Sequence, residues 1–504
     1  MQSQLEWYDL TDEERRIRDL AAEVASSEIA PRAEEHDREG TFVRDSIEAL
    51  GKSGLLGVFV PKEYGGLGGS PLAATLAIEI VSAACASTGM SFMFHCNLIH
   101  VVDGAGPDSL KEKYFPQFAA GKLGAFAINE QRRLFREKFD TVAAEDGDDY
   151  VLNGKKPFVT SAGEADVYIV QAQRADSDSP IPVMGQRYIL VEGAYPGVGA
   201  FVYDPMGLRG ASNGGITLDD VRVPKENAVG AEPDPMVRSV ATKGNSVFSP
   251  HLIALGCAGA ALDATIAHAQ ANGSPEWMSH ALAPLSDQLN ATRAYTYYAA
   301  RLMEGPISQR LNHAHNEIQR LGGEVGPLVC DKAMEIMGGG SFMRTSPIQR
   351  YYRDARGSCY PAFSMEHRRA NVADGLYGRA AYDQQPPTMP WDPHADYNFW
   401  LLWARGSAHL PEEAKQRMSR SAFEDFARSR GSDEMTVELC AEYMTTAGRP
   451  AGGPPGGGPP GGPPGGGPPG GGPPGGPPAG VGAGGPPAGV GSGGPPHPKE
   501  PLTQ

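Results

Sequence analysis

A carboxylate and an imidazole stand side by side at Glu366 and His367. Either side chain can act as a general base or acid when a protein positions it against a substrate. Arg368 and Arg369 follow directly, and they support a simpler interpretation in which Glu366 is an ion-paired surface carboxylate. Both interpretations stay open from these residues alone.

Other histidines and cysteines give weaker signals. His95, Cys96 and His100 share one short segment, where a histidine is more often a packed polar residue than a catalyst. His313 and His315 offer two imidazoles without an obvious third ligand, so we expect no metal site. The six cysteines are scattered, which argues against a disulfide framework or a zinc knuckle and indicates small buried side chains.

The charge balance excludes two classes of partner. The 504 residues carry a formal net charge of −16, with a pI of about 5.3. Such a protein lacks the basic face that binding to nucleic acid or to an anionic membrane requires. We find neither a run of about 20 apolar residues that could span a bilayer nor a basic, apolar N-terminal leader. We therefore expect a cytoplasmic protein that binds neither nucleic acid nor membrane.

Patterns of apolar residues divide the chain into predicted domains, which would have to position the candidate catalytic side chains. Residues 1–122 are expected to form a helical domain, opened by the capping box Thr11-Asp12-Glu13-Glu14. Residues 123–235 contain short apolar runs separated by Asp146-Gly147 and Asn153-Gly154, pairs typical of hairpin turns, which predicts an antiparallel β domain. Helices return over 236–380, with separate helices expected at 313–321 and 327–337. The predicted fold class is therefore α+β.

Two further segments follow these domains. Residues 396–446 are predicted to form a small helical domain, and parts of residues 410–438 resemble the C-terminal domain of the light-independent protochlorophyllide reductase B subunit. That resemblance implies a docking module for a protein partner. Residues 451–500 hold 23 glycines and 17 prolines, so we expect 449–504 to be a disordered, partly extended tail.

Several strings, in one order and at natural spacing, resemble the acyl-CoA dehydrogenase family over residues about 8–376. They include a Pro-Lys-Glu-Tyr-Gly-Gly-Leu-Gly turn, an Asn-Gly-Lys-Lys-Pro-Phe-Val-Thr strand, a Met-Gly-Leu-Arg segment and an Arg-Asp-Ala-Arg helix, at 61–68, 153–160, 206–209 and 353–356. The resemblance implies an N-terminal helical domain, a central β domain and a C-terminal helical bundle. It also implies FAD, an acyl-CoA or acyl-carrier thioester as substrate, and a homodimer or homotetramer.

The family's reaction needs a base that this chain does not show in the usual places. A carboxylate removes the proton next to the thioester while a hydride passes to the flavin. The family's glutamate aligns with Ala362, and its alternative place lies close to Ser249. Glu366 is the candidate base because it lies about one helical turn beyond Ala362 if that segment is helical. His367 and His251 are the other substitutes.

The resemblance also implies which residues surround the ligands. Thr160 matches the threonine that hydrogen-bonds flavin N5, and Phe158 replaces the tryptophan that packs on the ring. Arginines at 132, 133 and 136 replace the usual Gly-Ser-Asp loop, and Glu335 stands where a glutamine is common. The candidate flavin contacts are Phe126, Asn129, Phe158, Thr160, Ser161, Gly338 and Gly339, and the candidate acyl-pocket residues are His95 and Cys96.

These residues leave two functional hypotheses. The first is a flavoprotein oxidoreductase that acts on the CH–CH group of an acyl thioester with a non-standard base. Flavin monooxygenase chemistry, which needs no glutamate at that position, is a variant of it. The second is a non-redox lyase or assembly protein on the same fold, which the missing glutamate and the altered loop favour. We favour the first because flavin is the usual ligand of the fold.

Overall fold

A computed structural model shows the architecture of the chain. It describes residues 9–130, 139–177, 185–230, 244, 247–305, 309–359, 365–376, 426 and 428–431. The chain divides into two units, 1–450 and 451–504, and every described residue belongs to the first. The predicted tail at 449–504 lies outside the described residues, as does the predicted domain at 396–446 apart from 426 and 428–431.

The first part of the chain is helical, as predicted. Its helices are α1 (Asp12–Val24), α2 (Ala33–Glu39), α3 (Arg44–Lys52), α4 (Pro71–Ala84), α5 (Ala86–Ala105) and α6 (Asp108–Ala119). The predicted capping box begins α1, because the Glu14 N–H donates to Thr11 Oγ1 at 3.2 Å and the Thr11 N–H donates to Glu14 Oε2 at 2.9 Å. Helices α4 and α5 are buried over most of their length, as expected for segments rich in small and apolar residues.

A single sheet forms the middle of the described chain. Its strands are β1 (Gly124–Ala127), β2 (Val142–Asp146), β3 (Asp149–Val159), β4 (Val167–Arg174), β5 (Gln186–Glu192), β6 (Val198–Val202), β7 (Gly214–Pro224) and β8 (Ala228–Val229). Their order is β6-β7-β3-β2-β4-β5-β8, with β1 beside β4. Most pairs are antiparallel as predicted, but β1 and β2 each pair with β4 in parallel. The sheet is therefore mixed.

One of the two predicted turns is a turn and the other is not. Asp146 and Asp149 face each other across the β2–β3 hairpin, and Gly147 between them has a φ of 61°. Asn153-Gly154 lies inside β3 instead, where the register with β7 shifts. A Cβ at Gly154 would stand 2.5 Å from the Thr141 Cα. The hairpin prediction at Asn153-Gly154 is wrong because a bulge can use the same residues as a turn.

The last part of the described chain is a helical bundle. It consists of α8 (His251–Ala271), α9 (Glu276–Glu304), α10 (Gln309–Met337), α11 (Pro347–Gly357) and α12 (Met365–Leu376). Helix α10 is continuous through Pro327, where we expected two helices. Proline offers no N–H to the carbonyl of Gly323, four residues earlier. Cys359 Sγ lies 3.4 Å from that carbonyl and 3.0 Å from the carbonyl of Ala355, so a thiol from outside α10 offers the Gly323 carbonyl a shared, weak donor.

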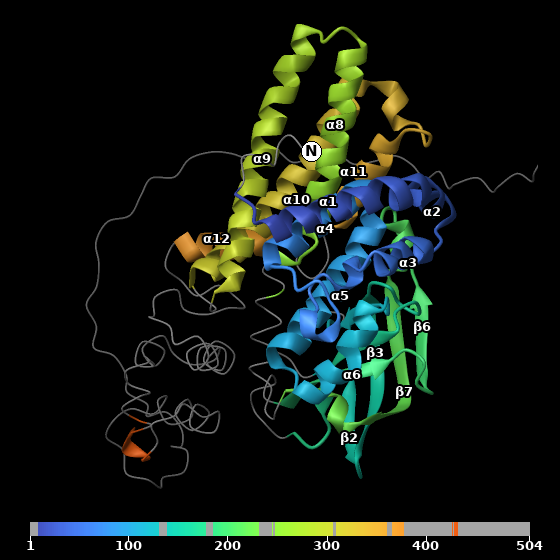
Figure 1. Cartoon of the computed structure of the whole chain (residues 1–504), viewed down its shortest axis with the longest axis vertical. Helices are drawn as coiled ribbons and strands as arrows, with labels where there is room; N and C mark the ends of the chain where they lie inside the picture. The colour runs from blue at the N-terminus through green and yellow to red at the C-terminus, as the bar shows by residue number, and fades with distance from the viewer. Residues whose placement is uncertain are drawn as a thin grey trace, which may run out of the picture. The chain divides into compact units, whose positions relative to one another are not determined.

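Helix α8 lies inside this bundle, in contact with α4, α9, α10 and α11 (Figure 1). Contrary to our expectation, it is long and apolar enough to cross a membrane, with a mean hydropathy of 1.5 over its most apolar window. Of that window, 67% is buried inside the protein, which is typical of a core helix.

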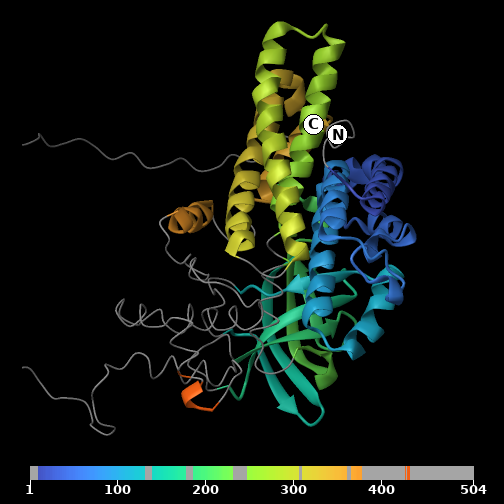
Figure 2. The same ribbon diagram turned by 60° about the vertical axis from the view of Figure 1, so that its left-hand side comes forward.

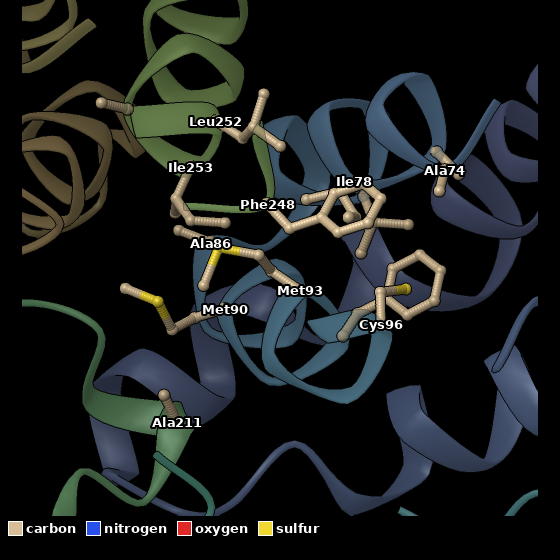
Figure 3. Packing of buried hydrophobic residues seen from close by; sticks show 14 of the residues in the cluster. Ala74, Ile78, Ala86, Met90, Met93, Cys96, Ala211, Phe248, Leu252 and Ile253 are labelled. Carbon is tan, nitrogen blue, oxygen red and sulfur yellow. The ribbon is translucent and has the colours of Figure 1, made fainter. Parts of the chain in front are cut away.

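The N-terminal helices pack against both the sheet and the bundle. Figure 2 shows them, in blue, along one side of these two layers, and α5 contacts both β1 and α8. At the contact between α5 and α8, Met90 and Met93 pack in one buried cluster with Phe248 and Ile253 (Figure 3). The start of α8 is therefore held against the helix that carries His95 and Cys96.

Candidate active site

The end of β3 and the turn after it carry two of the predicted flavin contacts. The Thr160 hydroxyl donates to Asn213 Oδ1 at 3.0 Å, and the Ser161 hydroxyl donates to Ser91 Oγ of α5 at 2.9 Å. Ser161 has a positive φ of 62°, and its N–H donates to the carbonyl of Ala211 at 2.9 Å. Two separate segments, α5 and residues 211–213, therefore set the positions of Thr160 and Ser161.

The two predicted aromatic contacts differ in exposure. Phe158 is 57% exposed, and its ring centroid lies 6.3 Å from that of Tyr203. The Tyr203 hydroxyl donates to the carbonyl of Pro157 at 3.0 Å, which holds this ring beside β3. An aromatic ring this open can pack against a planar ligand or another chain. Phe126 is buried instead, with its ring centroid 6.2 Å from that of Phe94.

A buried ion pair fixes the chain next to the half-buried Asn129. Lys156 Nζ donates to the Ile128 carbonyl at 3.0 Å and to Glu130 Oε1 at 2.9 Å. Burial lowers the pKa of Lys156 to about 8, and the neighbouring Glu130 opposes this shift. The Glu130 carboxylate also accepts the backbone N–H of Asp140 and of Thr141, at 2.7 and 3.0 Å. The pair therefore joins the two ends of residues 131–138, which contain the three arginines and lie outside the described residues.

His95 has a clear structural role. Its Nδ1 accepts the N–H of Gly124, at the start of β1, at 2.9 Å, so Nε2 carries the hydrogen that is donated to the Leu56 carbonyl at 2.9 Å. Burial lowers the pKa of His95 to about 4, so the imidazole is neutral. Both nitrogens are bonded to the backbone and neither is left for a substrate. Burial also raises the pKa of the neighbouring Cys96 thiol, and its place in an acyl pocket stays a prediction.

Gly338 and Gly339 lie where α10 ends. Gly338 has a φ of 72°, in the region that favours glycine, and the Ser341 hydroxyl donates to its carbonyl at 2.6 Å. A Cβ at either glycine would meet nothing within 4 Å, so both backbones are open to a ligand. Glu335, one turn earlier, forms an exposed ion pair with Lys332 at 2.5 Å.

The positions considered for the base fall in two places. Glu366 and His367 belong to α12, and their side chains lie outside the described residues, as does all of Ala362. Ser249 and His251 are described and buried, and the Ser249 hydroxyl lies 2.5 Å from His251 Nδ1. The assignment of Glu366 as the base stays a prediction.

Taken together, the described side chains fit a flavin. Thr160 offers a fixed hydroxyl, Phe158 an open aromatic ring, and Gly338 and Gly339 an open backbone. Sequence reasoning missed the Lys156–Glu130 pair. A lysine on a strand that alternates between buried and exposed positions was the available signal, but charged residues are rarely buried without a partner, and this partner is 26 residues away.

Comparisons with known proteins agree with this architecture. Three family models of acyl-CoA dehydrogenase match the chain: the N-terminal domain over residues 11–122, the middle domain over 135–221 and the C-terminal domain over 249–376. The chain is 30% identical over 367 residues to "Probable acyl-CoA dehydrogenase YngJ" of Bacillus subtilis, covering 69% of this chain and 94% of that one. It is also 30% identical over 359 residues to the mitochondrial short-chain specific acyl-CoA dehydrogenase of Mus musculus, covering 69% and 86%.

A solved structure gives the same result. Butyryl-CoA dehydrogenase from Megasphaera elsdenii matches with a TM-score of 0.68 and 27% identity, covering 73% of this chain and 99% of that one. All three parts of the described fold, the N-terminal helices, the sheet and the bundle, therefore have counterparts in one family. The chain belongs to the acyl-CoA dehydrogenase family.

Proposed function

We propose that this protein is an FAD-dependent oxidoreductase that removes two hydrogens from the CH–CH group of an acyl thioester. The observation that carries the proposal is the fixed Thr160 hydroxyl beside the open Phe158 ring, in a chain that matches all three domains of the family. The thioester is carried by coenzyme A or by an acyl-carrier protein.

When FAD is bound, it supplies the acceptor for the hydride. The Thr160 hydroxyl gives its hydrogen to Asn213, so its oxygen keeps lone pairs that can accept an N–H from a ligand. The open ring of Phe158 offers apolar surface against which a planar ligand can pack. We assign the removal of the proton from the carbon next to the thioester carbonyl to Glu366, since neither Ala362 nor Ser249 is a carboxylate.

The absorption spectrum of the purified protein tests this proposal. We expect a flavin band that survives desalting after incubation with FAD, and that bleaches when an acyl-CoA is added without oxygen. Thr160→Val should weaken the flavin band or its bleaching, whereas Thr217→Val on the neighbouring strand β7 should not. A protein that stays colourless with FAD would contradict the redox function and favour a lyase or assembly protein on this fold.

We extend the proposal to assembly and location. Val202, Tyr203 and Met206 follow one another along exposed chain at and after β6, and Phe342 and Met343 are exposed after α10. Exposed apolar side chains of this kind suit an interface between copies of the chain. We therefore propose a homodimer or homotetramer, and light scattering during gel filtration measures its mass. A monomer at micromolar concentration would contradict it. We also propose a cytoplasmic location, which the free cysteines of the described residues support.

A further inference from the structure

His251, at the first turn of α8, has one bonded and one unbonded ring nitrogen. The residue is 1% exposed. Its Nδ1 lies 2.5 Å from Ser249 Oγ, whereas Nε2 is buried without a hydrogen-bond partner among the described residues. Leaving a buried polar group unpaired costs about 1–3 kcal/mol. Such an atom indicates that something outside the described chain bonds to it.

Two glycines of α10 make room for this ring and for α12. A Cβ at Gly322 would lie 2.7 Å from the His251 Cβ, and a Cβ at Gly323 would lie 2.9 Å from the Met365 sulfur. Glycine inside a helix costs about 1 kcal/mol relative to alanine. The two glycines allow α8 and α12 to approach the same turn of α10.

The described chain stops at Cys359 and resumes at Met365, and both of these residues lie at this turn of α10. The sulfur of Cys359, just before that gap, lies 3.4 Å from the Gly323 carbonyl. Met365, just after it, packs on Gly323 as well. His251 packs on Gly322, one residue earlier. The imidazole therefore packs on the same turn of α10 as Cys359 and Met365, the described residues nearest in the chain to Ala362, with which the family's glutamate aligns.

The electrostatic surroundings of His251 keep it neutral. Burial lowers its pKa to about 3, and the nearby charges of Arg368 and His315 act in the same direction. Arg368 is 3% exposed, and its guanidinium donates to the Gln319 carbonyl at 3.3 Å. A neutral imidazole with a lowered pKa accepts a proton poorly at neutral pH, but it can polarise a carbonyl by donating a hydrogen bond. The buried positive charge of Arg368 favours a negative charge at the same place.

We propose that His251 is a substrate-binding residue whose Nε2–H donates a hydrogen bond to the carbonyl oxygen of the acyl thioester, and that Ser249 fixes this tautomer by donating its hydroxyl hydrogen to Nδ1. The inference rests on the proposed function. When the proton next to the carbonyl passes to the base, the electron pair of the broken C–H bond moves toward the carbonyl oxygen. The hydrogen bond from His251 then strengthens, because it now meets an anionic oxygen.

A 3-oxoacyl-CoA separates this role from the redox step. This ligand ionises to an enolate without losing a hydride, and the enolate absorbs in the ultraviolet. The experiment therefore titrates the bound ligand with pH in the purified full-length protein and measures its apparent pKa. His251→Leu should raise that pKa by about 2 units. This corresponds to a roughly hundredfold weaker stabilisation of the enolate, as removal of one such donor typically produces.

Further variants distinguish a donor from a base or from a structural residue. His251→Gln keeps an N–H donor but cannot accept a proton, so it should retain most of the ligand ionisation. Ser249→Ala keeps the imidazole but no longer fixes which of its nitrogens carries the hydrogen. It should therefore raise the ligand pKa by less than His251→Leu does. His268→Leu, near the other end of α8, is the control and should leave the ligand pKa unchanged. Circular dichroism verifies the fold of each variant.

Each outcome has one meaning. A ligand pKa unchanged in both His251→Leu and Ser249→Ala would overturn the proposal. A His251→Gln variant as impaired as His251→Leu would overturn the donor role. Failure of the unaltered protein to bind the 3-oxoacyl thioester would overturn this proposal together with the proposed substrate class. Normal ionisation of the ligand in a protein that acyl-CoA does not bleach would contradict only the redox function.

Discussion

Lys156 is fully buried, and its ammonium lies 2.9 Å from the carboxylate of Glu130. The same nitrogen donates to the Ile128 carbonyl and lies 4.1 Å from the centre of the Phe139 ring. These contacts enclose one charge between the end of β1 and the start of β2. The half-buried Asn129, a predicted flavin contact, lies between Ile128 and Glu130 and therefore depends on the pair for its position.

Removal of one partner should therefore be costly. Lys156→Met leaves the Glu130 carboxylate buried without its cation, and we expect a loss of about 3–5 kcal/mol in the free energy of unfolding. The exposed neighbour Lys155→Met is the control and should lose less than about 1 kcal/mol. The double variant Lys156→Met/Glu130→Met should recover part of the loss. Urea unfolding measures all three, and equal losses for Lys156→Met and Lys155→Met would contradict the role of the pair.

Asp354 should make stability depend on pH. Its Oδ1 accepts the Leu208 N–H at 2.6 Å, and burial raises its pKa to about 6. In the unfolded chain the carboxyl loses its proton near pH 4. Between about pH 4 and 6 the folded state therefore binds more protons, and the free energy of unfolding falls as the pH rises.

Asp354→Asn keeps an oxygen for the Leu208 N–H and removes the titration. From pH 4 to pH 7 the free energy of unfolding of the unaltered protein should fall by on the order of 3 kcal/mol relative to that of this variant. Urea unfolding at pH 4, 5.5 and 7 measures the difference. A difference that stays constant over this range would contradict the buried carboxyl.

Gly339 and Gly322 should respond differently to alanine. A Cβ at Gly339 meets nothing within 4 Å, whereas a Cβ at Gly322 would lie 2.7 Å from His251. Gly339→Ala should therefore leave thermal stability nearly unchanged and weaken FAD binding at least severalfold, if the ligand approaches this backbone as predicted. Gly322→Ala should cost about 1–3 kcal/mol through overpacking. Fluorescence titration with FAD and thermal unfolding separate the two, and unchanged FAD affinity in Gly339→Ala would remove this residue from the site.

Glu366 should be required for the reductive step alone. Glu366→Gln should keep the flavin spectrum and slow the bleaching by acyl-CoA by at least about a hundredfold, the usual contribution of a positioned base. Glu324→Gln is the control, because Glu324 forms ion pairs with Arg320 and Arg369 and is not assigned to the chemistry. Stopped-flow absorbance measures the rates. Equal rates in the two variants would favour the alternative interpretation of Glu366 as an ion-paired surface carboxylate.

Local features of the sequence were enough for much of the fold. The capping box at Thr11 and Glu14, the turn at Asp146-Gly147 and the sequence of helices, strands and helices are all observed. Each depends on residues a few positions apart, whose interactions recur in many proteins. The strings that resemble the family are equally local, and the matches to three domains confirm them.

Tertiary structure decided the rest, because it depends on partners that are distant in the chain. Pro327 does not end α10, and the thiol of the distant Cys359 lies against the carbonyl that the proline leaves free. Likewise, the alternation along β3 is compatible with a buried Lys156, but only the fold brings Glu130 to it. No local pattern shows that His95 bonds two backbone groups from different segments. The composition, spacing and family of the chain can be read from its sequence. His251 is neutral, with only one ring nitrogen hydrogen-bonded, because of its place where α8, α10 and α12 meet. Burial and neighbouring charges, which depend on that place, determine the protonation of an imidazole.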